Sequence, residues 1–572
     1  MSDLKWWQKV VFYQIYPRSF ADGNGDGIGD FMGITEKLDY LKDLGVEGLW
    51  LSPHFPSPNW DCGYDISDYE DVAPEYGNLE DFKIFLAGAH ARGMHVILDL
   101  VLNHTSDEHR WFQESKSSRD NPKADWYVWV DTPPNNWQSC FDGSAWSFTP
   151  GRDQYYYHYF MKQQPDLNWH NPQVRQAMWN VARFWLDMGV DGFRLDAIGT
   201  IFEDPALTPH SVPLDLAGLR FLSDIAQTPE DRAQAETYWR EMFKYQLGQP
   251  GIHDVLKELR AVLDEYDGDR LLVGEDDDVS YLGNGRDELD MVFNFPLMRT
   301  DLITPQWVLK NQQERLAALA AVSPEAWACN TLGNHDNSRV YTRYSLARLG
   351  GDGTHDGARA RLALAVILTL CGTPFLYNGE EIGMTDYLIP NRSSLRDTMA
   401  TWYFDHLMEK LKLDPIDAAR RAAAMSRDKN RTPMQWRNAL NAGFCPEDVT
   451  PWLPVNPNYA SGINVQEQEK DPASLLTFYR RLLRLRKANP ALVEGDYQPL
   501  PTPNPEFLAF RRSTREQSVL VVLNFSERSA SLDLSTLSTN TIRVLLSSTG
   551  STTVGLARLS FAPFEICLLQ VK

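Results

Sequence analysis

Cysteine is scarce in this 572-residue sequence, and long apolar runs are missing. No two cysteines form a CxxC or CxxxC pair, which argues against a zinc site and a disulfide scaffold. The longest apolar run, Leu362 to Cys371, has about half of the ~20 residues that a membrane-spanning helix requires. The segment from Met1 to Val10 lacks the apolar core and the cleavage site of a signal peptide. We therefore expect a cytoplasmic protein without a membrane partner.

Positive charge is also in deficit, because 55 Lys and Arg face 77 Asp and Glu and leave a net charge of −22. This excess of negative charge repels phosphate backbones and anionic lipids, and the sequence has no local basic patch to offset it. A nucleic-acid partner is therefore not expected. A hydrophobic content of 43% against 23% charged residues is typical of a folded globular protein and not of a disordered acidic chain. A neutral small-molecule partner fits this charge balance better than a nucleic acid or an anionic lipid surface does.

Short apolar runs that end in polar or acidic residues recur along the chain and indicate β-strands. Between them, apolar residues at helical spacing, such as Met178, Val181, Trp185 and Met188, predict helices that bury one stripe against a sheet. Alternating strands and helices imply parallel pairing, and eight units suggest an α/β fold that closes into a (β/α)₈ TIM barrel. The eight runs are Val10–Tyr16, Val46–Ser52, His95–Asp99, Val190–Asp196, Leu271–Glu275, Met291–Phe295, Cys329–Asp336 and Pro374–Asn378.

Long interruptions and a change of composition predict further domains. Residues 104–171, rich in Trp, Tyr, Pro and Asn, predict a small domain inserted after the third strand. Residues 1–103 and 172–489 would form the barrel, with a further insertion at about 380–452 that contains a charged, helix-like segment at 418–427. Residues 490–572 are rich in Ser, Thr and Val and alternate in polarity, as in Ser518–Leu523 and Phe564–Val571. This pattern predicts a C-terminal antiparallel β-sandwich.

Charged and polar residues gather where the predicted barrel strands end. In a barrel of this kind, active-site groups lie at the C-terminal ends of the strands. An isolated Asp at a strand end is more often a helix cap, but charged groups next to runs as apolar as GVDGFRL are costly to bury unless they pair or serve a site. The residues at these ends are Asp99, Asn103, His104, Arg194, Asp196, Glu275, His335 and Asp336.

At this point the sequence resembles a known family. The ordered motifs QIYPRSFADGNGDGIGD, DLVLNH, QPDLNW, GFRLDA, VGE and NHDNSR are similar to those of the α-amylase superfamily of glycoside hydrolases, family 13. The QPDLNW form resembles the oligo-1,6-glucosidase and α-glucosidase branch. The resemblance runs from about residue 5 to the C-terminus and includes SRDKNRTPMQW, NAGF and PWLPVNPNY.

The resemblance implies a retaining mechanism with two carboxyl groups about 5–5.5 Å apart. It assigns the nucleophile to Asp196, the acid/base to Glu275, and the grip on sugar hydroxyls in the transition state to Asp336. Arg194 lies two residues before Asp196 on the same strand face, so we expect it to hold that carboxylate ionised and its pKa low.

The resemblance also implies a set of groups that bind one glucose. An arginine of SRDKNRTPMQW is expected to pair with Asp61 at the far end of the site, and we favour Arg431 over Arg427. Closure of that end suggests an exo-acting enzyme that removes or transfers one terminal glucose. The implied substrate-binding residues are Asp61, Tyr64, His104, Phe160, Gln164, Arg194, His335 and Arg431.

A separate metal site is indicated by DGNGDGIGD. Oxygen donors alternate at every second residue, and Gly27 takes the sixth position, where calcium loops turn sharply. The resemblance implies a structural Ca²⁺ or Mg²⁺ remote from the pocket, and the sequence suggests no organic cofactor; the alternative is a hydrogen-bonded turn without metal. The candidate ligands are Asp22, Asn24, Asp26, the Ile28 carbonyl and Asp30.

Two features bear on specificity. The acidic run Asp276 to Asp278 after Glu275 could keep that group protonated, could bind a polyhydroxyl leaving group, or could be a solvated loop. Ala197, directly after the nucleophile, resembles relatives that prefer α-1,4 linkages, whereas valine there accompanies α-1,6 preference.

The sequence thus predicts a retaining α-glucosidase, monomeric or homodimeric, that acts on a small neutral sugar substrate with α-1,4 favoured over α-1,6. The alternative is a transglucosidase or isomerase of the same fold, such as a sucrose isomerase or trehalose synthase. A non-catalytic transporter heavy chain fits poorly because all three carboxylates are in place. A secreted carbohydrate-binding protein fits poorly because no aromatic platform is evident in the terminal domain.

Overall fold

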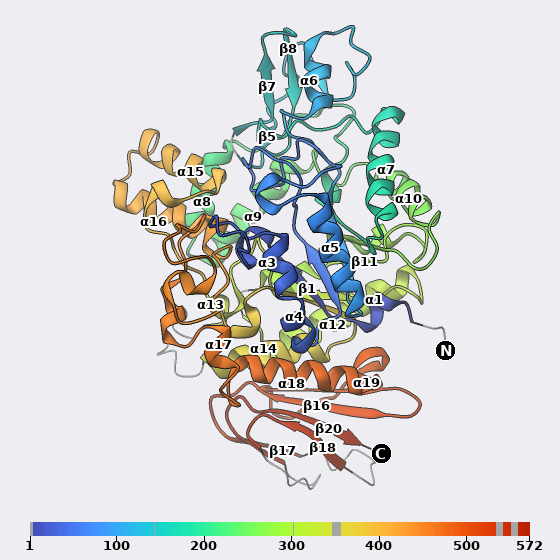
Figure 1. Cartoon of the computed structure of the whole chain (residues 1–572), viewed down its shortest axis with the longest axis vertical. Coiled ribbons are helices and arrows are strands. Elements are labelled where there is room, and N and C mark those ends of the chain that lie inside the picture. Colours follow the sequence, from blue (N-terminus) through green and yellow to red (C-terminus); the bar gives the residue numbers. More distant parts are fainter. Residues whose placement is uncertain are drawn as a thin grey trace.

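Eight parallel strands form the centre of the computed structural model, which describes residues 4–141, 143–300, 302–345, 356–533, 542–550 and 559–571. Their order is β11-β10-β9-β3-β2-β1-β13-β12, and a parallel bridge between Phe293 and Cys329 joins the two edges. The barrel prediction is therefore confirmed (Figure 1). The strands are β1 (Phe12–Ile15), β2 (Gly48–Leu51), β3 (His95–Val101), β9 (Gly192–Asp196), β10 (Leu271–Gly274), β11 (Met291–Val292), β12 (Cys329–Thr331) and β13 (Thr373–Tyr377).

Alternation along these strands decides which side chains face the barrel interior. Ile97 of β3 belongs to the cluster that fills the interior, whereas Val96 and Leu98 belong to the cluster beneath the surrounding helices. The next residue on the inward side of β3 is therefore Asp99. Arg194 lies opposite Asp99 in the β3–β9 register and is buried on the same side. The sequence thus lines the upper interior of the barrel with charge.

The helices around the barrel show the apolar stripes that the sequence predicts. Helix α7 (Pro172–Asp187) begins at Asn171, whose side chain accepts the N–H of Gln173, and it buries Met178, Val181 and Trp185. The remaining surrounding helices include α4 (Leu38–Leu44), α5 (Leu79–Ala91), α10 (Ile252–Leu263), α12 (Pro305–Val322) and α14 (Asp356–Thr369). No helix in the described part of the chain is long and apolar enough to span a membrane.

A small β-rich unit stands between β3 and α7, at the top of Figure 1. It contains α6 (Arg110–Ser117), a two-stranded sheet of β5 (Gln138–Ser139) and β6 (Gly143–Ser144), and an antiparallel sheet in the order β4 (Trp129–Val130), β8 (Gln154–Tyr157) and β7 (Trp146–Thr149). All of these elements fall within the predicted insertion 104–171. A bridge from His104 to Asp166 ties the two ends of this unit together beside the barrel strands.

Two helical excursions lie side by side at the left of Figure 1. Helices α15 (Thr398–Glu409) and α16 (Pro415–Met425) follow β13, within the predicted insertion 380–452. Helices α8 (Leu216–Ile225) and α9 (Pro229–Phe243), between β9 and β10, were not expected as an excursion. Arg421 of α16 forms an ion pair with Asp224 of α8, so the two excursions support each other.

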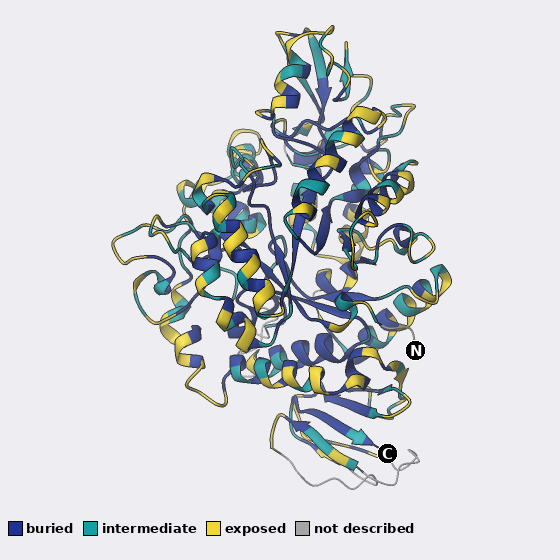
Figure 2. Cartoon of the chain, turned by 45° about the vertical axis from the view of Figure 1, so that its right-hand side comes forward, coloured by how far each residue is buried: buried dark blue, intermediate teal, exposed yellow. Residues whose placement is uncertain are grey.

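The C-terminal unit is an antiparallel β-sandwich, as predicted. Its main sheet has the order β14 (Asp496–Pro499), β15 (Phe507–Ser513), β16 (Ser518–Asn524), β20 (Ile566–Val571) and β18 (Ile542–Ser547), and β17 (Ala530–Leu532) pairs with β19 (Leu559–Phe561) in a second sheet. Alternate residues of β16, such as Leu520 and Val522, face the second sheet, whereas Val519 and Val521 belong to the main core that includes α18 (Leu475–Ala488). Figure 2 shows the strands of both the barrel and this unit as largely buried.

One arginine links the sandwich to the barrel. Arg512 of β15 is fully buried and donates to the carbonyls of Thr369 and Leu370, each at 2.7 Å, and to that of Gly495 at 3.0 Å. Thr369 is the last residue of α14, so the guanidinium caps the negative end of that helix. The C-terminal unit is therefore anchored to the barrel by a buried charge as well as by apolar contacts.

Candidate active site

Arg194 is the centre of the charged cluster inside the barrel mouth. Its Nη1 lies 2.6 Å from Asp196 Oδ1 and also contacts Asp99, while its Nη2 lies 2.9 Å from Glu275 Oε2. Asp196 ends β9 and Glu275 follows β10, the neighbouring strand. The structure thus brings the predicted nucleophile and the predicted acid/base onto one guanidinium group.

Solvent access differs sharply among these groups. The side chains of Glu275 and Asp336 are 22% and 29% exposed, whereas those of Asp196 and Arg194 are 9% and 1% exposed. The two more exposed acids mark the side from which a substrate can enter. Glu275 is fixed by the backbone N–H of Ala197, which its Oε2 accepts at 3.0 Å. The predicted proton donor is therefore hydrogen-bonded to the residue that follows the predicted nucleophile.

Burial dominates the protonation of the two central acids. It raises the pKa of Asp196 to about 7, and Arg194 opposes the shift without overcoming it. Burial likewise raises the pKa of Glu275 to about 8, with Arg194 again opposing and Asp196 adding to the rise. The expectation that Arg194 keeps the Asp196 pKa low is wrong, because burial of the carboxyl group outweighs the opposing effect of Arg194. Glu275 is therefore the group that keeps its proton to the higher pH.

A second cluster surrounds His335. Tyr64 Oη lies 2.7 Å from His335 Nε2 and 3.2 Å from Asp99 Oδ2, and the two rings stack at 5.4 Å with an angle of 4°. Gln14 Nε2 lies 2.7 Å from His335 Nδ1. Burial lowers the pKa of His335 well below its usual value, so the ring is neutral. Asp99 thereby connects the histidine cluster to Arg194 through Tyr64.

Asp336 completes the set of three carboxylates. Its Oδ1 lies 2.5 Å from Arg431 Nη2, and its Oδ2 lies 3.2 Å from His335 Nε2. Burial acts to raise the pKa of Asp336, but its contact with the neutral His335 ring and the charges of Arg431 and Arg427 hold it well below the usual range. This carboxylate is therefore ionised in the structure, in contrast to Glu275.

Asp61 and its hydrogen-bond partners form the far end of the candidate site. Asp61 Oδ2 accepts from Gln164 Nε2 at 3.1 Å, and its Oδ1 accepts from Arg427 Nη2 at 2.7 Å. Gln164 Nε2 also lies 3.0 Å from His104 Nε2, and the Phe160 ring meets the His104 ring edge-on at 4.9 Å. Burial lowers the pKa of His104 to about 3, so this ring is neutral as well. The predicted binding residues His104, Phe160 and Gln164 therefore lie together beside Asp61.

Arg431 requires a correction. The prediction that it pairs with Asp61 is wrong, because Arg427 makes that ion pair and Arg431 binds Asp336 instead. Arg431 is fully buried, and its Nε donates to the backbone carbonyl of His335 at 2.9 Å. It is thus held against the loop after β12, which carries Asp336, and it does not reach the β2 side of the site.

The acidic run after Glu275 forms a solvated turn. Asp276 Oδ1 accepts the N–H groups of Asp277 and Asp278, and Asp277 and Asp278 are exposed. Asp278 caps a short 3₁₀ turn by accepting the N–H of Ser280. The raised pKa of Glu275 comes from burial and from Asp196 and Asp336. The hypothesis that the acidic run keeps Glu275 protonated gains no support here.

The loop predicted to bind metal is wound by its own hydrogen bonds. Asp22 accepts the N–H groups of Gly25 and Gly27, at 2.6 and 2.9 Å, and Asn24 accepts that of Asp26 at 2.9 Å. Asp30 caps the helix after the loop through Gly33 N–H at 2.6 Å. Within the described residues, no three Asp, Glu, His or Cys side chains converge closely enough to hold an ion. A cation would therefore have to use the Asn24 and Ile28 oxygens as well.

Two residues that hydrogen-bond to the site could not be recognised from the sequence: Asp397, which contacts Arg427, and Trp50, which contacts Asp99. Asp397 accepts from Arg427 Nε at 3.1 Å and from Nη2 at 3.0 Å, and it precedes α15 as a helix cap. Trp50 Nε1 donates to Asp99 Oδ2 at 3.0 Å. An Asp before a helical pattern signals a cap, but nothing in the sequence relates Asp397 to an arginine 30 residues later.

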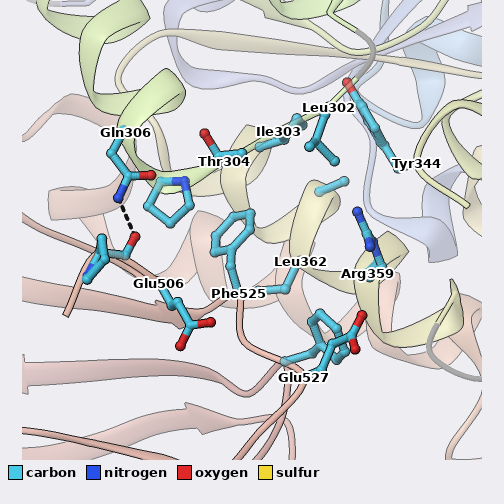
Figure 3. A pocket seen from close by; sticks show the side chains of 14 residues that line it. Leu302, Ile303, Thr304, Gln306, Tyr344, Arg359, Leu362, Glu506, Phe525 and Glu527 are labelled. Atoms are coloured by element: carbon cyan, nitrogen blue, oxygen red, sulfur yellow. Dashed lines mark hydrogen bonds between the residues drawn. The ribbon is translucent and has the colours of Figure 1, made fainter. Parts of the chain in front are cut away.

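A cavity of about 350 Å³ lies elsewhere, between the barrel and the C-terminal unit. Figure 3 shows its lining, with Leu302, Ile303, Phe525 and Leu362 as apolar walls and the hydrogen bond from Gln306 to the Pro505 carbonyl at one side. None of the predicted site residues lines it. It is therefore separate from the charged cluster at the barrel mouth.

Comparison with known proteins agrees with this fold. Residues 14–495 match the family model described as alpha amylase, catalytic domain, and residues 497–568 match that of the maltogenic amylase C-terminal domain. The chain belongs to the α-amylase family of glycoside hydrolases, family 13.

Individual relatives match over almost the whole chain. An oligo-1,6-glucosidase of Parageobacillus thermoglucosidasius is 39% identical over 540 residues, 91% of each chain. A probable alpha-glucosidase of Rhizobium meliloti (strain 1021) is 40% identical over 550 residues, 93% of this chain and 91% of that protein. Among solved structures, a trehalulose synthase, MutB, in complex with Tris has a TM-score of 0.85 at 37% identity, over 99% of this chain and 100% of that chain.

Proposed function

We propose that the protein is a retaining, exo-acting α-glucosidase that cleaves a terminal α-linked glucose from short oligosaccharides or sucrose-like glucosides. The observation that carries the proposal is the contact of Arg194 with both Asp196 and Glu275 at the barrel mouth. A pair of closely spaced carboxyl groups with separated protonation states is what a retaining mechanism requires. The names of the relatives support the same class of reaction.

The proposed reaction has two steps. In the first, an oxygen of ionised Asp196 bonds to the anomeric carbon while the glycosidic C–O bond breaks, and Glu275 gives its proton to the leaving oxygen. In the second, Glu275 takes a proton from water, whose oxygen bonds to the anomeric carbon as the bond to Asp196 breaks. Arg194 stays charged throughout and stabilises each carboxylate as it becomes ionised.

The exo mode is supported by the hydrogen-bonded groups around Asp61 at the far end of the site. Asp61, Gln164 and Arg427 form a hydrogen-bonded barrier there, with Asp61 and Gln164 buried. A terminal glucose can present its hydroxyls to these polar groups, but a longer chain cannot continue past them. Ala197 after the nucleophile supports a preference for α-1,4 over α-1,6 linkages.

The decisive test is substitution of the nucleophile. Asp196→Asn should lower kcat on an aryl α-glucoside by at least about 10³-fold, because the amide cannot form the glucosyl-enzyme. Near-normal release of glucose by this variant would overturn the assignment. A product profile from maltose, isomaltose, sucrose and trehalose then defines the linkage.

The alternative is transfer of glucose to a sugar acceptor or isomerisation of the substrate. The observation that favours it is the likeness of the whole chain to a trehalulose synthase. Both functions share the first step and differ in whether water or a sugar attacks the glucosyl-enzyme. Chromatography of products at high sucrose or maltose concentration separates them: free glucose supports hydrolysis, and new disaccharides support transfer.

We further propose that the DGNGDGIGD loop binds a structural Ca²⁺ or Mg²⁺ through Asp22, Asn24, Asp26, the Ile28 carbonyl and Asp30. The support is the winding of the loop, with Gly25 and Gly27 at φ of 83° and 91° and successive side-chain oxygens turned toward the loop backbone. We also propose a cytoplasmic enzyme, monomeric or homodimeric; six cysteines without a disulfide support a reducing compartment.

A further inference from the structure

Arg427 reaches the site from outside the barrel. It follows α16, and its Nη2 donates to Asp61 Oδ1 at 2.7 Å while its Nη1 lies 3.6 Å from Asp336 Oδ1. An arginine side chain has many rotamers, and fixing one in a single position costs conformational entropy. Some other group must therefore determine where this guanidinium lies.

Asp397 is that group. Its carboxylate is fully buried and accepts three hydrogen bonds from Arg427: from Nε at 3.1 Å, from Nη2 at 3.0 Å and from the backbone N–H at 2.8 Å. It also accepts the N–H of Met399 at 3.2 Å and so caps α15. The paired bonds to Nε and Nη2 fix the plane of the guanidinium, which a single bond does not.

We propose that Asp397 is a positioning residue that holds Arg427 against Asp61, so that the α15–α16 excursion sets how tightly the terminal glucose is bound. This inference rests on the proposed function, because it assigns Asp61 and Arg427 to the far end of a glucose site. In the described part of the chain, the hydrogen bonds of the Asp397 carboxylate join it to Met399 and Arg427, and none joins it to Asp196 or Glu275. Its influence should therefore fall on binding more than on bond cleavage.

The local structure provides a matched control. Asp428, the neighbour of Arg427, accepts the N–H groups of Arg396 and Asp397 at 2.6 and 3.0 Å. It is a buried carboxylate that joins the same two segments, but its hydrogen bonds are to backbone groups and not to the Arg427 side chain. Asp428→Asn removes one negative charge from the same junction and leaves the hold on the guanidinium intact.

The test is a double-mutant cycle read as KM and kcat on maltose and on an aryl α-glucoside. Asp397→Asn must turn an N–H toward the guanidinium and should raise KM about 10-fold, the size of a lost hydrogen bond to a charged group, with a smaller change in kcat. In an Arg427→Lys background, where the paired bonds cannot form, the same substitution should change KM less than about 2-fold. Asp428→Asn should leave KM within about 2-fold of the wild-type value.

Several outcomes would overturn the inference: an unchanged KM for Asp397→Asn, an equal rise in the Arg427→Lys background, or an equal rise for Asp428→Asn. If Asp397→Asn fails to fold, Asp397→Ser keeps a helix-capping oxygen without the charge and should show the same rise in KM. The inhibition constant for glucose gives an independent measure of the site and should rise with KM. A wild-type protein that releases no glucose from any α-glucoside would contradict the proposed function instead.

Discussion

Glu275 accepts a hydrogen bond from the backbone N–H of Ala197 at 3.0 Å, so the predicted proton donor is attached to the residue that follows the predicted nucleophile. Ala197 adopts a left-handed conformation, with φ of 43° and ψ of 45°. This conformation is uncommon for residues other than glycine and costs free energy. The turn after β9 thus uses local strain to direct an N–H toward Glu275.

The first prediction concerns this turn. Ala197→Val should lower the free energy of unfolding by about 1–2 kcal/mol, because a β-branched side chain disfavours the left-handed region more than alanine does. Ala197→Gly fits the conformation and should stay within about 0.5 kcal/mol of the wild type. Denaturant unfolding measures both. Equal stability of the two variants would contradict the argument.

The second prediction is a narrow pH optimum. Asp196 must be ionised to attack, so kcat/KM should fall as the pH drops below about 7, the value to which burial raises its pKa. Glu275 must be protonated to donate, so kcat/KM should fall as the pH rises above about 8. The two groups interact, and the apparent values therefore belong to the pair. A pH profile of kcat/KM on an aryl α-glucoside tests this.

A variant of Glu275 separates the acidic and alkaline limbs of this pH profile. Glu275→Gln should abolish the alkaline limb and should slow substrates with poor leaving groups far more than those with good ones, which need no proton. A variant that keeps the alkaline limb would show that another group donates the proton.

The third prediction concerns the joint between barrel and sandwich. Arg512→Met leaves the carbonyls of Thr369, Leu370 and Gly495 without their donors and should lower the free energy of unfolding by about 2–4 kcal/mol. Arg511→Met, on the adjacent position of the same strand, is the control and should change it by under about 1 kcal/mol, since among the described residues the Arg511 side chain donates a hydrogen bond to the Gln498 side chain alone. KM should be unchanged in both.

The fourth prediction concerns the DGNGDGIGD loop. Removal of metal with a chelator should lower Tm, and Ca²⁺ or Mg²⁺ should restore it, because an ion bound only to the folded state stabilises that state. Asp22→Asn should abolish the response to chelation. Thermal unfolding that is the same with and without chelator would mean that the hydrogen-bonded turn needs no ion.

The sequence was informative about strands for a physical reason. Each barrel strand is a short, buried apolar run bounded by polar groups, and such runs are readable without the structure. The helices α8 and α9 were missed as an excursion because their apolar stripes resemble those of ordinary barrel helices. Periodicity reports which face of a helix is buried, but not against what.

For single residues of the site, too, the sequence does not reveal which groups they contact. Arg427 and Arg431 lie four residues apart in one motif, and both form ion pairs with carboxylates of the site. The choice between them depends on Asp397, which lies outside the motif, and on the course of the chain between the two arginines. The pKa of Asp196 was misjudged because the sequence does not reveal how far burial of this carboxyl group outweighs the nearby Arg194.

The sandwich lies at the opposite end of the molecule from the unit formed by α6, β7 and β8, and β20, the last strand of the chain, belongs to it (Figure 1). An affinity tag or a resin attached through the C-terminus would therefore hold the enzyme with its mouth facing the bulk solution. Immobilised preparations made this way should retain the turnover of the free enzyme, whereas coupling through surface groups of residues 104–171 should obstruct the entry of sugar.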